Sequence, residues 1–356
     1  MNSYFLCITQ YSNVGDLLIN KMLVEELCLH GKVFVDAFHV PENFKSLLLD
    51  HPNAIDVTGK YGISLKKMDI WRVYRLISKQ KIELYTESPG PIRKLPLSLK
   101  YLFVVIHHVV KYGGAHVVKI GNCCSTAILK KQKINLNGIE HLYVRSEESV
   151  KYLNRQYNNI ASYIPDLACL LRFRIQVPNT KKNIIAINLR CEPEEKDIMI
   201  KESLTLIQNF SNKGFQILVY YQVAVDRVFA EQLYKNCAHI DNVSLVSKQI
   251  CYSDLSFYSD VSFVVSNRLH SLLIGSVYNC IPIAYGIKNH KCAKIEHVFV
   301  DLFGDKCNLF MFNDSEHVMR AVKNEKEMRN IVYSSIEKAA NVCRTVVEDI
   351  KRNMYV

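Results

Sequence analysis

The stretch SNRLHSLLIGSVYNCIPIAYG, residues 266–286, decides the fold predicted for this chain. The apolar run at 261–265 is typical of a buried parallel strand, and residues 272–278 are typical of a helix packed on the same sheet. Arg268 and His270 stand between them, where charged groups are costly unless something pairs with them. The end of a strand followed by the start of a helix is also where backbone N–H groups attract anions. The stretch therefore predicts a phosphate or carboxylate site in a parallel α/β fold.

Strand and helix patterns alternate on both sides of this stretch. In the first half, residues 4–10, 13–31 and 32–38 predict a strand, a helix and a strand, and a later helix at 97–112 ends on Gly113 and Gly114. A second unit begins with the strand at 184–190, after a segment without periodicity. We therefore predict two Rossmann-like domains facing a central cleft, at residues 1–175 and 180–314, with C-terminal helices at 315–356 packing across them.

Composition narrows the class of protein. With 356 residues and 49% hydrophobic content, the chain can build two cores. Residues 1–178 hold 23 Lys and Arg against 14 Asp and Glu, so +9 of the net charge of +11 lies in the first half. This excess favours a phosphorylated ligand, a membrane surface or a nucleic acid, and the alternative is a basic, solvated surface.

Targeting and metal signals are weak in this sequence. The twelve cysteines are scattered, which predicts reduced, mostly buried thiols rather than a zinc site or a disulfide framework. The first ten residues predict a strand rather than a signal peptide, and the longest apolar run is shorter than the roughly 20 residues that span a bilayer. We therefore expect a cytoplasmic protein that uses no metal and no cofactor.

Three side chains carry the predicted chemistry. Arg268 offers a bidentate fork for an anionic group, and His270 can give or take a proton near neutral pH. Arg190, at the end of the predicted strand 184–190, occupies the equivalent edge of the same sheet and supplies a second guanidinium. The alternative is structural: Arg268 would be paired with a carboxylate at the domain interface, and His270 would be a satisfied core histidine.

Five segments in order resemble the polysaccharide pyruvyl transferase family. They are NVGDLLI, YVRSEESVKYL, IPDLACLL, IAINLR and DVSFVVSNRLHSLLIGSVYNCIPIAYGIKNHK, and they cover roughly residues 11–300. The resemblance implies a GT-B-like architecture and the transfer of pyruvate from phosphoenolpyruvate to two hydroxyls of a sugar, which forms a cyclic ketal in bacterial capsule or surface polysaccharide assembly.

The resemblance also assigns roles to residues. His270 would be the acid that protonates the methylene carbon, and Arg268 would assist it. The donor, phosphoenolpyruvate, would be bound on the C-terminal domain by Arg190, Arg268, Leu269 and Lys291. Arg145 and Asp166 match segments that look structural, with a salt bridge or turn near the domain junction as the expected role.

The N-terminal domain would bind the acceptor. In NVGDLLI, Gly15 stands where the backbone must approach a ligand or a neighbour closely, with Asn13 and Asp16 at the helix start. We expect these three residues on the acceptor side, and for Asp16 a plain helix cap is the alternative. The sequence departs from the family pattern in the loops at 87–91 and 119–126 and at Ser146, which leaves the acceptor sugar undetermined.

The helix at 97–112 raises a membrane hypothesis. Lys100, His107, His108 and Lys111 lie at helical spacing, with Arg93 and Lys94 just before the helix. One interpretation is peripheral attachment to the anionic inner face of the cell membrane, where a lipid-pyrophosphate-linked sugar acceptor would be found. The other is an ordinary helix buried on the sheet.

Two other functions remain open at this stage. A GT-B glycosyltransferase that uses a nucleotide sugar would have the same architecture, and a non-catalytic partner in glycan assembly is a further alternative. Nucleic-acid binding is disfavoured because the basic residues are not interleaved with aromatic residues in one stripe.

Overall fold

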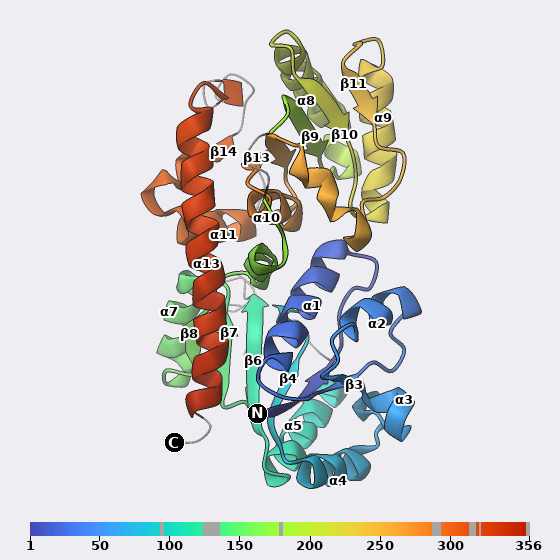
Figure 1. The fold of residues 1–356 in the computed structure, drawn as a ribbon, viewed down its shortest axis with the longest axis vertical. Coiled ribbons are helices and arrows are strands. Elements are labelled where there is room, and N and C mark those ends of the chain that lie inside the picture. The colour runs from blue at the N-terminus through green and yellow to red at the C-terminus, as the bar shows by residue number, and fades with distance from the viewer. Residues whose placement is uncertain are drawn as a thin grey trace. The chain divides into compact units, whose positions relative to one another are not determined.

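The computed structural model describes residues 1–92, 96–123, 136–177, 181–286, 293–312, 318–319 and 322–353. Two compact units divide the chain. Unit 1 holds residues 1–11, 16–167 and 341–356, and unit 2 holds residues 12–15 and 168–340. Each unit is an α/β fold around one parallel sheet, as the sequence predicts (Figure 1).

Unit 1 contains the eight-stranded sheet. Its strand order is β3-β2-β1-β4-β6-β7-β8, and β5 pairs with β6. The strands are β1 Asn2–Leu6, β2 Val33–Asp36, β3 Ala54–Asp56, β4 Ile82–Glu87, β5 Gly90–Pro91, β6 His116–Cys123, β7 His141–Val144 and β8 Ala161–Tyr163. The helices are α1 Val14–Cys28, whose first two residues belong to unit 2, α2 Glu42–Leu48, α3 Val57–Tyr61, the 3-10 turn Leu65–Lys67, α4 Ile70–Gln80, α5 Leu97–Tyr112 and α7 Glu147–Tyr157.

Unit 2 contains a six-stranded sheet in the order β11-β10-β9-β12-β13-β14. The strands are β9 Ile184–Asn188, β10 Gln216–Val219, β11 Val243–Leu245, β12 Phe263–Ser266, β13 Ile281–Tyr285 and β14 Met311–Phe312. The main helices are α8 Lys196–Ser211, α9 Arg227–Cys237, α10 Leu269–Val277 and α11 Ala293–Phe303. Counted from β9, this is the doubly wound order 3-2-1-4-5-6, which binds ligands where the order reverses.

Short 3-10 helices complete the second unit, and one long helix follows them. The 3-10 helices are Leu167–Arg174, whose first residue lies in unit 1, Pro193–Glu195, Ala224–Asp226, Tyr252–Ser259 and Gly304–Leu309. Helix α13, Glu325–Asn353, supplies residues 325–340 to unit 2 and its remaining residues to unit 1.

The stretch at residues 261–286 folds into the predicted buried strand and helix. All four residues of β12 are buried, and so is every residue of α10 except His270. A helix that is apolar on nearly all sides needs a buried position, which the sheet provides. Gly275 permits the close contact, because a Cβ there would lie 2.6 Å from Val264 Cγ2.

Candidate functional site

The candidate site lies at the reversal point of the second sheet, between β9 and β12. These two strands are neighbours, and Asn188 lies level with Ser266 at their carboxyl ends. Arg190 follows the first strand, and Arg268 with His270 follows the second. The structure therefore brings Arg190, Arg268 and the predicted acid His270 to one edge of one sheet, where a parallel fold presents its ligand site.

Two small polar residues lock these strand ends together. The Asn267 side chain accepts a hydrogen bond from the Arg190 backbone N–H at 2.7 Å and donates one to the Arg190 carbonyl at 2.7 Å. Ser266 Oγ donates to the Asn188 carbonyl and accepts from the Arg268 backbone N–H at 2.9 Å. The backbones that carry both arginines are thus held in register. Neither residue was predicted from the sequence, where the only signal is that Ser266 ends a buried strand and Asn267 follows it.

Arg268 is the N-cap residue of α10 and has a buried partner. Its Nε donates to Asp226 Oδ2 at 2.9 Å, and its Nη2 donates to Asp226 Oδ1. The Asp226 side chain is 3% exposed and that of Arg268 is 20% exposed. The sequence left open that Arg268 is paired with a carboxylate at the domain interface. The structure shows such a pair, but the carboxylate, Asp226, belongs to the same unit as Arg268. The pair fixes the orientation of the guanidinium at the sheet edge.

Arg190 is held more loosely than Arg268. Its side chain is 49% exposed, and its Nη2 donates to Glu192 Oε1 at 2.8 Å. An ion pair this exposed contributes little to stability, because water screens it and both side chains lose rotamer freedom. The guanidinium can therefore turn toward a ligand at small cost.

His270 lies in the first turn of α10 and is partly buried. Gly15, which belongs to the same unit, packs directly against it: a Cβ on Gly15 would lie 2.0 Å from His270 Nδ1 and 2.3 Å from its Cγ. Only a glycine leaves room for the imidazole there. The expectation that Gly15 marks a close backbone approach is confirmed, and the neighbour it approaches is the predicted acid.

The other predicted site residues take varied positions. Asn13 Oδ1 accepts a hydrogen bond from the Gly15 backbone N–H at 3.0 Å, so it caps the start of α1. Asp16 lies in the first turn of that helix, and its carbonyl accepts from Asn20 Nδ2 at 2.6 Å. Leu269 is buried, so its side chain packs in the core and only its backbone can serve a ligand. Lys291 lies outside the described residues.

A buried polar network supports the first turn of α10. Asn188 Nδ2 donates to Ser271 Oγ at 2.7 Å, and Ser271 Oγ donates to Gln222 Oε1 at 2.6 Å. Gln222 Nε2 donates to Tyr258 Oη at 2.7 Å, which lies 2.9 Å from Tyr220 Oη. Burial raises the pKa of both phenols, so they remain neutral donors. These hydrogen bonds connect Ser271, the residue next to His270, to the ends of two neighbouring strands.

Unit 1 has its own buried charged cluster at the end of β4. Glu87 Oε2 accepts from Lys119 Nζ at 2.6 Å, and Glu87 Oε1 lies 3.0 Å from His107 Nε2. Burial opposes ionisation of Glu87, but the Lys119 ammonium and His107 outweigh it and lower the pKa of the carboxyl to about 2. His107 is 3% exposed. Of the two interpretations of this helix, the membrane-facing stripe is therefore wrong for His107, and the alternative of a helix buried on the sheet describes it, because the Glu87 carboxylate holds its side chain inside.

Arg145 and Asp166 form the predicted structural salt bridge. Both residues are buried, and Arg145 Nη1 donates to Asp166 Oδ2. Burial alone would lower the pKa of Arg145, but the carboxylate outweighs it and raises the pKa. Ser146, which departs from the family pattern, caps α7 by accepting from the Ser149 backbone N–H at 3.1 Å.

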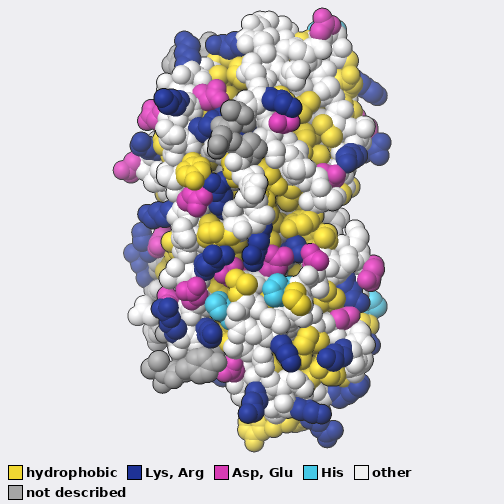
Figure 2. All heavy atoms as spheres, viewed as in Figure 1, with side chains coloured by type: hydrophobic (Ala, Val, Ile, Leu, Met, Phe, Trp, Pro, Cys, Tyr) yellow, Lys and Arg dark blue, Asp and Glu magenta, His cyan; other side chains and the backbone are white. Residues whose placement is uncertain are grey.

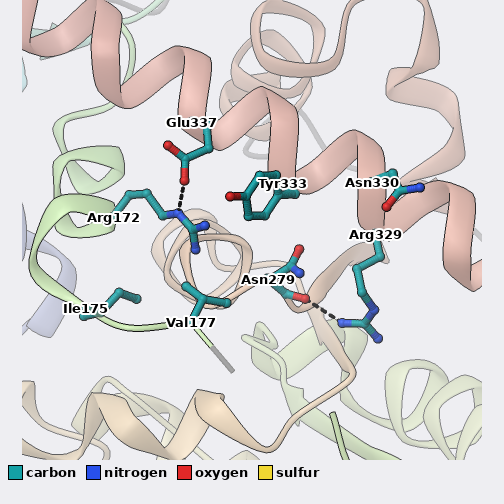
Figure 3. Close-up of a pocket in the computed structure, with 8 residues that line it drawn as sticks. All are labelled: Arg172, Ile175, Val177, Asn279, Arg329, Asn330, Tyr333 and Glu337. Carbon is teal, nitrogen blue, oxygen red and sulfur yellow. Dashed lines mark hydrogen bonds and ion pairs between the residues drawn. The ribbon is translucent and has the colours of Figure 1, made fainter. Parts of the chain in front are cut away.

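A cavity of about 450 Å³ lies near the opposite edge of the second sheet (Figure 3). Asn279, on its wall, follows α10 and precedes β13, whereas the candidate site lies where α10 begins. Arg172 Nε donates to Glu337 Oε1 at 2.5 Å, and Arg329 Nη1 donates to the Asn279 carbonyl at 2.6 Å. Both hydrogen bonds connect α13 to the rest of unit 2. We therefore assign the two guanidiniums a structural role in holding that helix. The cavity is lined by Arg172, Ile175, Val177, Asn279, Arg329, Asn330, Tyr333 and Glu337.

The described part of the chain contains neither a metal-binding cluster nor a membrane-spanning helix. Within it, no group of three or more His, Cys, Asp or Glu side chains is arranged to hold a metal ion. Among the described helices, none is both long enough and apolar enough to cross a bilayer.

Two solved structures share the fold of this chain. A glycosyltransferase from Rickettsia africae aligns with a TM-score of 0.63 at 10% identity, covering 99% of this chain and 98% of that one. A putative UDP-N-acetylglucosamine 2-epimerase from Listeria monocytogenes aligns with a TM-score of 0.64 at 7% identity, covering 99% and 96%. At such low identity the likeness concerns the fold alone. The chain has a GT-B-like fold.

The sequence itself places the chain more narrowly. Residues 113–289 match the model of the polysaccharide pyruvyl transferase family, and over that stretch the chain belongs to this family. The matched stretch includes β9, β12, α10 and all three of Arg190, Arg268 and His270. A search of curated proteins found no match.

Proposed function

We propose that the protein transfers the pyruvyl group of phosphoenolpyruvate to two hydroxyls of a sugar in bacterial capsule or surface polysaccharide assembly. One observation carries the proposal: Arg190, Arg268 and His270 gather at the reversal point of a doubly wound sheet, inside the stretch that matches the pyruvyl transferase family. Phosphoenolpyruvate carries a phosphate and a carboxylate, and two guanidiniums beside a helix N-terminus suit both groups.

Each residue has a distinct task in this scheme. Arg268, oriented by Asp226, and Arg190, free to turn away from Glu192, bind the two anionic groups. The backbone N–H of Leu269, at the start of α10, lies at the positive end of the helix dipole, which attracts the anionic groups of the donor. The proposal also gives Lys291 a place on the donor side.

The reaction begins with a proton transfer. His270 gives its proton to the methylene carbon of phosphoenolpyruvate, which becomes a methyl group and leaves the central carbon electrophilic. A sugar hydroxyl forms a bond to that carbon and loses its proton. The bond from the central carbon to the phosphate oxygen then breaks, and a second hydroxyl attacks the same carbon. Two hydroxyl protons are lost in total; one replaces the proton given by His270 and the other leaves with phosphate.

The acceptor is assigned to the N-terminal domain and to the start of α1. Asn13, Gly15 and Asp16 would line the acceptor side, with Gly15 setting the position of His270. We place the sugar on a lipid-pyrophosphate carrier at the cytoplasmic face of the membrane, in line with the excess of positive charge in the first half of the chain.

Ligand-dependent thermal stability tests the donor assignment. A ligand that binds only the folded state stabilises it by about 2.7 kcal/mol at 100 times its dissociation constant. We expect phosphoenolpyruvate to raise the melting temperature of the wild type and to raise that of Arg190→Ala much less. Arg190 is the cleaner position because its partner Glu192 is partly exposed and tolerates the loss. Lys213→Ala, an exposed change in the same unit, is the control.

The same experiment separates the competing functions. Stabilisation by a nucleotide sugar, with none by phosphoenolpyruvate, would make the protein a glycosyltransferase and end the pyruvyl proposal. A response to neither donor would favour a non-catalytic partner in glycan assembly.

A further inference from the structure

Unit 1 carries a row of three aromatic rings on α4 and at the end of α5, in which the partly buried Tyr74 contacts two exposed rings. Trp71, the only tryptophan of the chain, is 71% exposed, and Tyr112 is 84% exposed. The Trp71 and Tyr74 rings meet edge to face with centroids 6.2 Å apart, and Tyr74 stacks on Tyr112 at 6.1 Å. Large rings this exposed, in a group, are unusual unless something covers them.

Basic side chains accompany these rings on α4. Arg72, Arg75 and Lys79 are exposed on the same helix as Trp71. Residues 57–81 carry seven Lys and Arg against one acidic residue, Asp69. Figure 2 shows Lys and Arg side chains gathered on the part of the molecule where Figure 1 labels α3 and α4. We call Trp71, Tyr74, Tyr112, Arg72, Arg75 and Lys79 the aromatic-basic surface.

Helices α4 and α5 are held in the fold by their inner faces, so packing does not explain why their outer faces carry exposed aromatic and aliphatic side chains. The inward face of α4 places Val73, Leu76 and Ile77 in the core, and α5 contributes Ile106 and Val110. The outward face of α5 carries exposed residues at helical spacing: Tyr101, Val105, His108 and Tyr112. Because the inner faces already stabilise both helices, the apolar outer positions point to a partner.

We propose that the aromatic-basic surface docks unit 1 on an anionic lipid bilayer. Tryptophan and tyrosine rings are amphipathic and reside at the headgroup level, while Arg and Lys are attracted to anionic lipids. Exposed aliphatic side chains, Val105 at 49% and Met68 at 55%, favour a bilayer over a nucleic acid, since base stacking has no use for them. This surface would also bring the protein to a lipid-linked acceptor. That link to the acceptor rests on the proposed function, whereas the membrane contact itself does not.

Tryptophan fluorescence provides a direct test. Because Trp71 is the only tryptophan, its emission reports on this surface alone. Full-length protein at low salt is mixed with phosphatidylcholine vesicles, with or without phosphatidylglycerol. We expect a blue shift, with quenching by brominated lipid, only on the anionic vesicles, and a weaker response at high salt. Absence of a blue shift on anionic vesicles would overturn the inference.

Two charge-matched variants locate the contact. Arg75→Glu with Lys79→Glu should lower the vesicle affinity at least about tenfold, because each basic residue near an anionic surface contributes several-fold. Lys213→Glu with Lys235→Glu makes the same change in net charge at exposed positions of unit 2 and should keep the affinity. Equal losses in both variants would show that net charge acts rather than this surface, and would refute the inference.

Two further outcomes are decisive. A blue shift with a single-stranded oligonucleotide, and none with vesicles, would assign the surface to nucleic acid and overturn the membrane contact. The vesicle assay uses no phosphoenolpyruvate, so vesicle binding without any response to that donor would contradict the proposed function alone.

Discussion

Gly15→Ala tests the placement of His270. The added Cβ would lie 2.0 Å from His270 Nδ1, whereas ordinary contacts between heavy atoms are at about 3.5 Å. The imidazole or the start of α1 must therefore move by about 1.5 Å. A misplacement of about 1 Å at a reacting group can cost about 100-fold in rate, and an overpacked site typically costs about 1–3 kcal/mol of stability.

Turnover and donor binding should respond differently to this change. Arg190 and Arg268 keep their own partners, so the affinity for phosphoenolpyruvate, measured by thermal stabilisation, should change little. Phosphate release from phosphoenolpyruvate in the presence of an accepting sugar should fall at least about 100-fold. A loss of affinity equal to the loss of turnover would indicate a general disturbance of the unit.

Gly59→Ala is the matched control for the same chemical change. A Cβ there would meet only the Asp56 side chain, at 2.7 Å from its Oδ2, on helix α3 of unit 1. Its turnover should equal that of the wild type. Turnover of Gly15→Ala within threefold of the wild type would refute the placement of His270 as the acid.

Substitutions at two further sites test the buried charges. Arg268→Ala leaves the Asp226 carboxylate buried without its partner and should cost about 3 kcal/mol of stability, whereas Arg268→Gln combined with Asp226→Asn should restore most of it, as measured by urea denaturation. Glu87 has a pKa lowered to about 2, so its contribution is complete above about 4.5 and is lost as the pH falls toward 2. Urea denaturation followed by circular dichroism measures the free energy of unfolding of the wild type and of Glu87→Gln. The difference between the two should shrink by about 3 kcal/mol as the pH falls across that window. A constant difference would contradict the ion cluster with Lys119 and His107.

The longer elements could be predicted from the sequence because α5 has a periodic apolar face and β9 lies in a continuous apolar run. The predicted helix at 97–112 coincides with α5, and the predicted strand at 184–190 contains β9. The segment at 39–70 gave no prediction, although it contains α2, β3 and α3. These elements have at most seven residues, too few for a periodic signal, and depend on local caps such as Asp56, which accepts from the Gly59 backbone N–H.

Helical spacing alone could not tell which face of α5 is buried. His107 and His108 are adjacent in the sequence, yet His107 is buried against Glu87 while His108 is exposed. The decisive partner lies 20 residues upstream, on β4. No pattern within the helix predicts a carboxylate from another element, so the expected basic stripe failed there. The exposed aromatic residues of α4 were missed for the same reason, because exposure depends on neighbours.

At the candidate site, too, the sequence pattern could not identify a partner that lies far away in the sequence. Sequence pattern places Arg268 at the end of a strand and the start of a helix, and the structure agrees. It could not supply Asp226, which lies 42 residues earlier and holds two nitrogens of the guanidinium. The structural and functional interpretations of Arg268 are therefore not exclusive, because a carboxylate that orients the fork can also prepare it for a ligand. It follows that Arg268→Ala alone cannot distinguish them, since it would remove the proposed ligand contact and also leave the Asp226 carboxylate buried without its partner. Only a variant that removes both partners isolates the role of the arginine in binding.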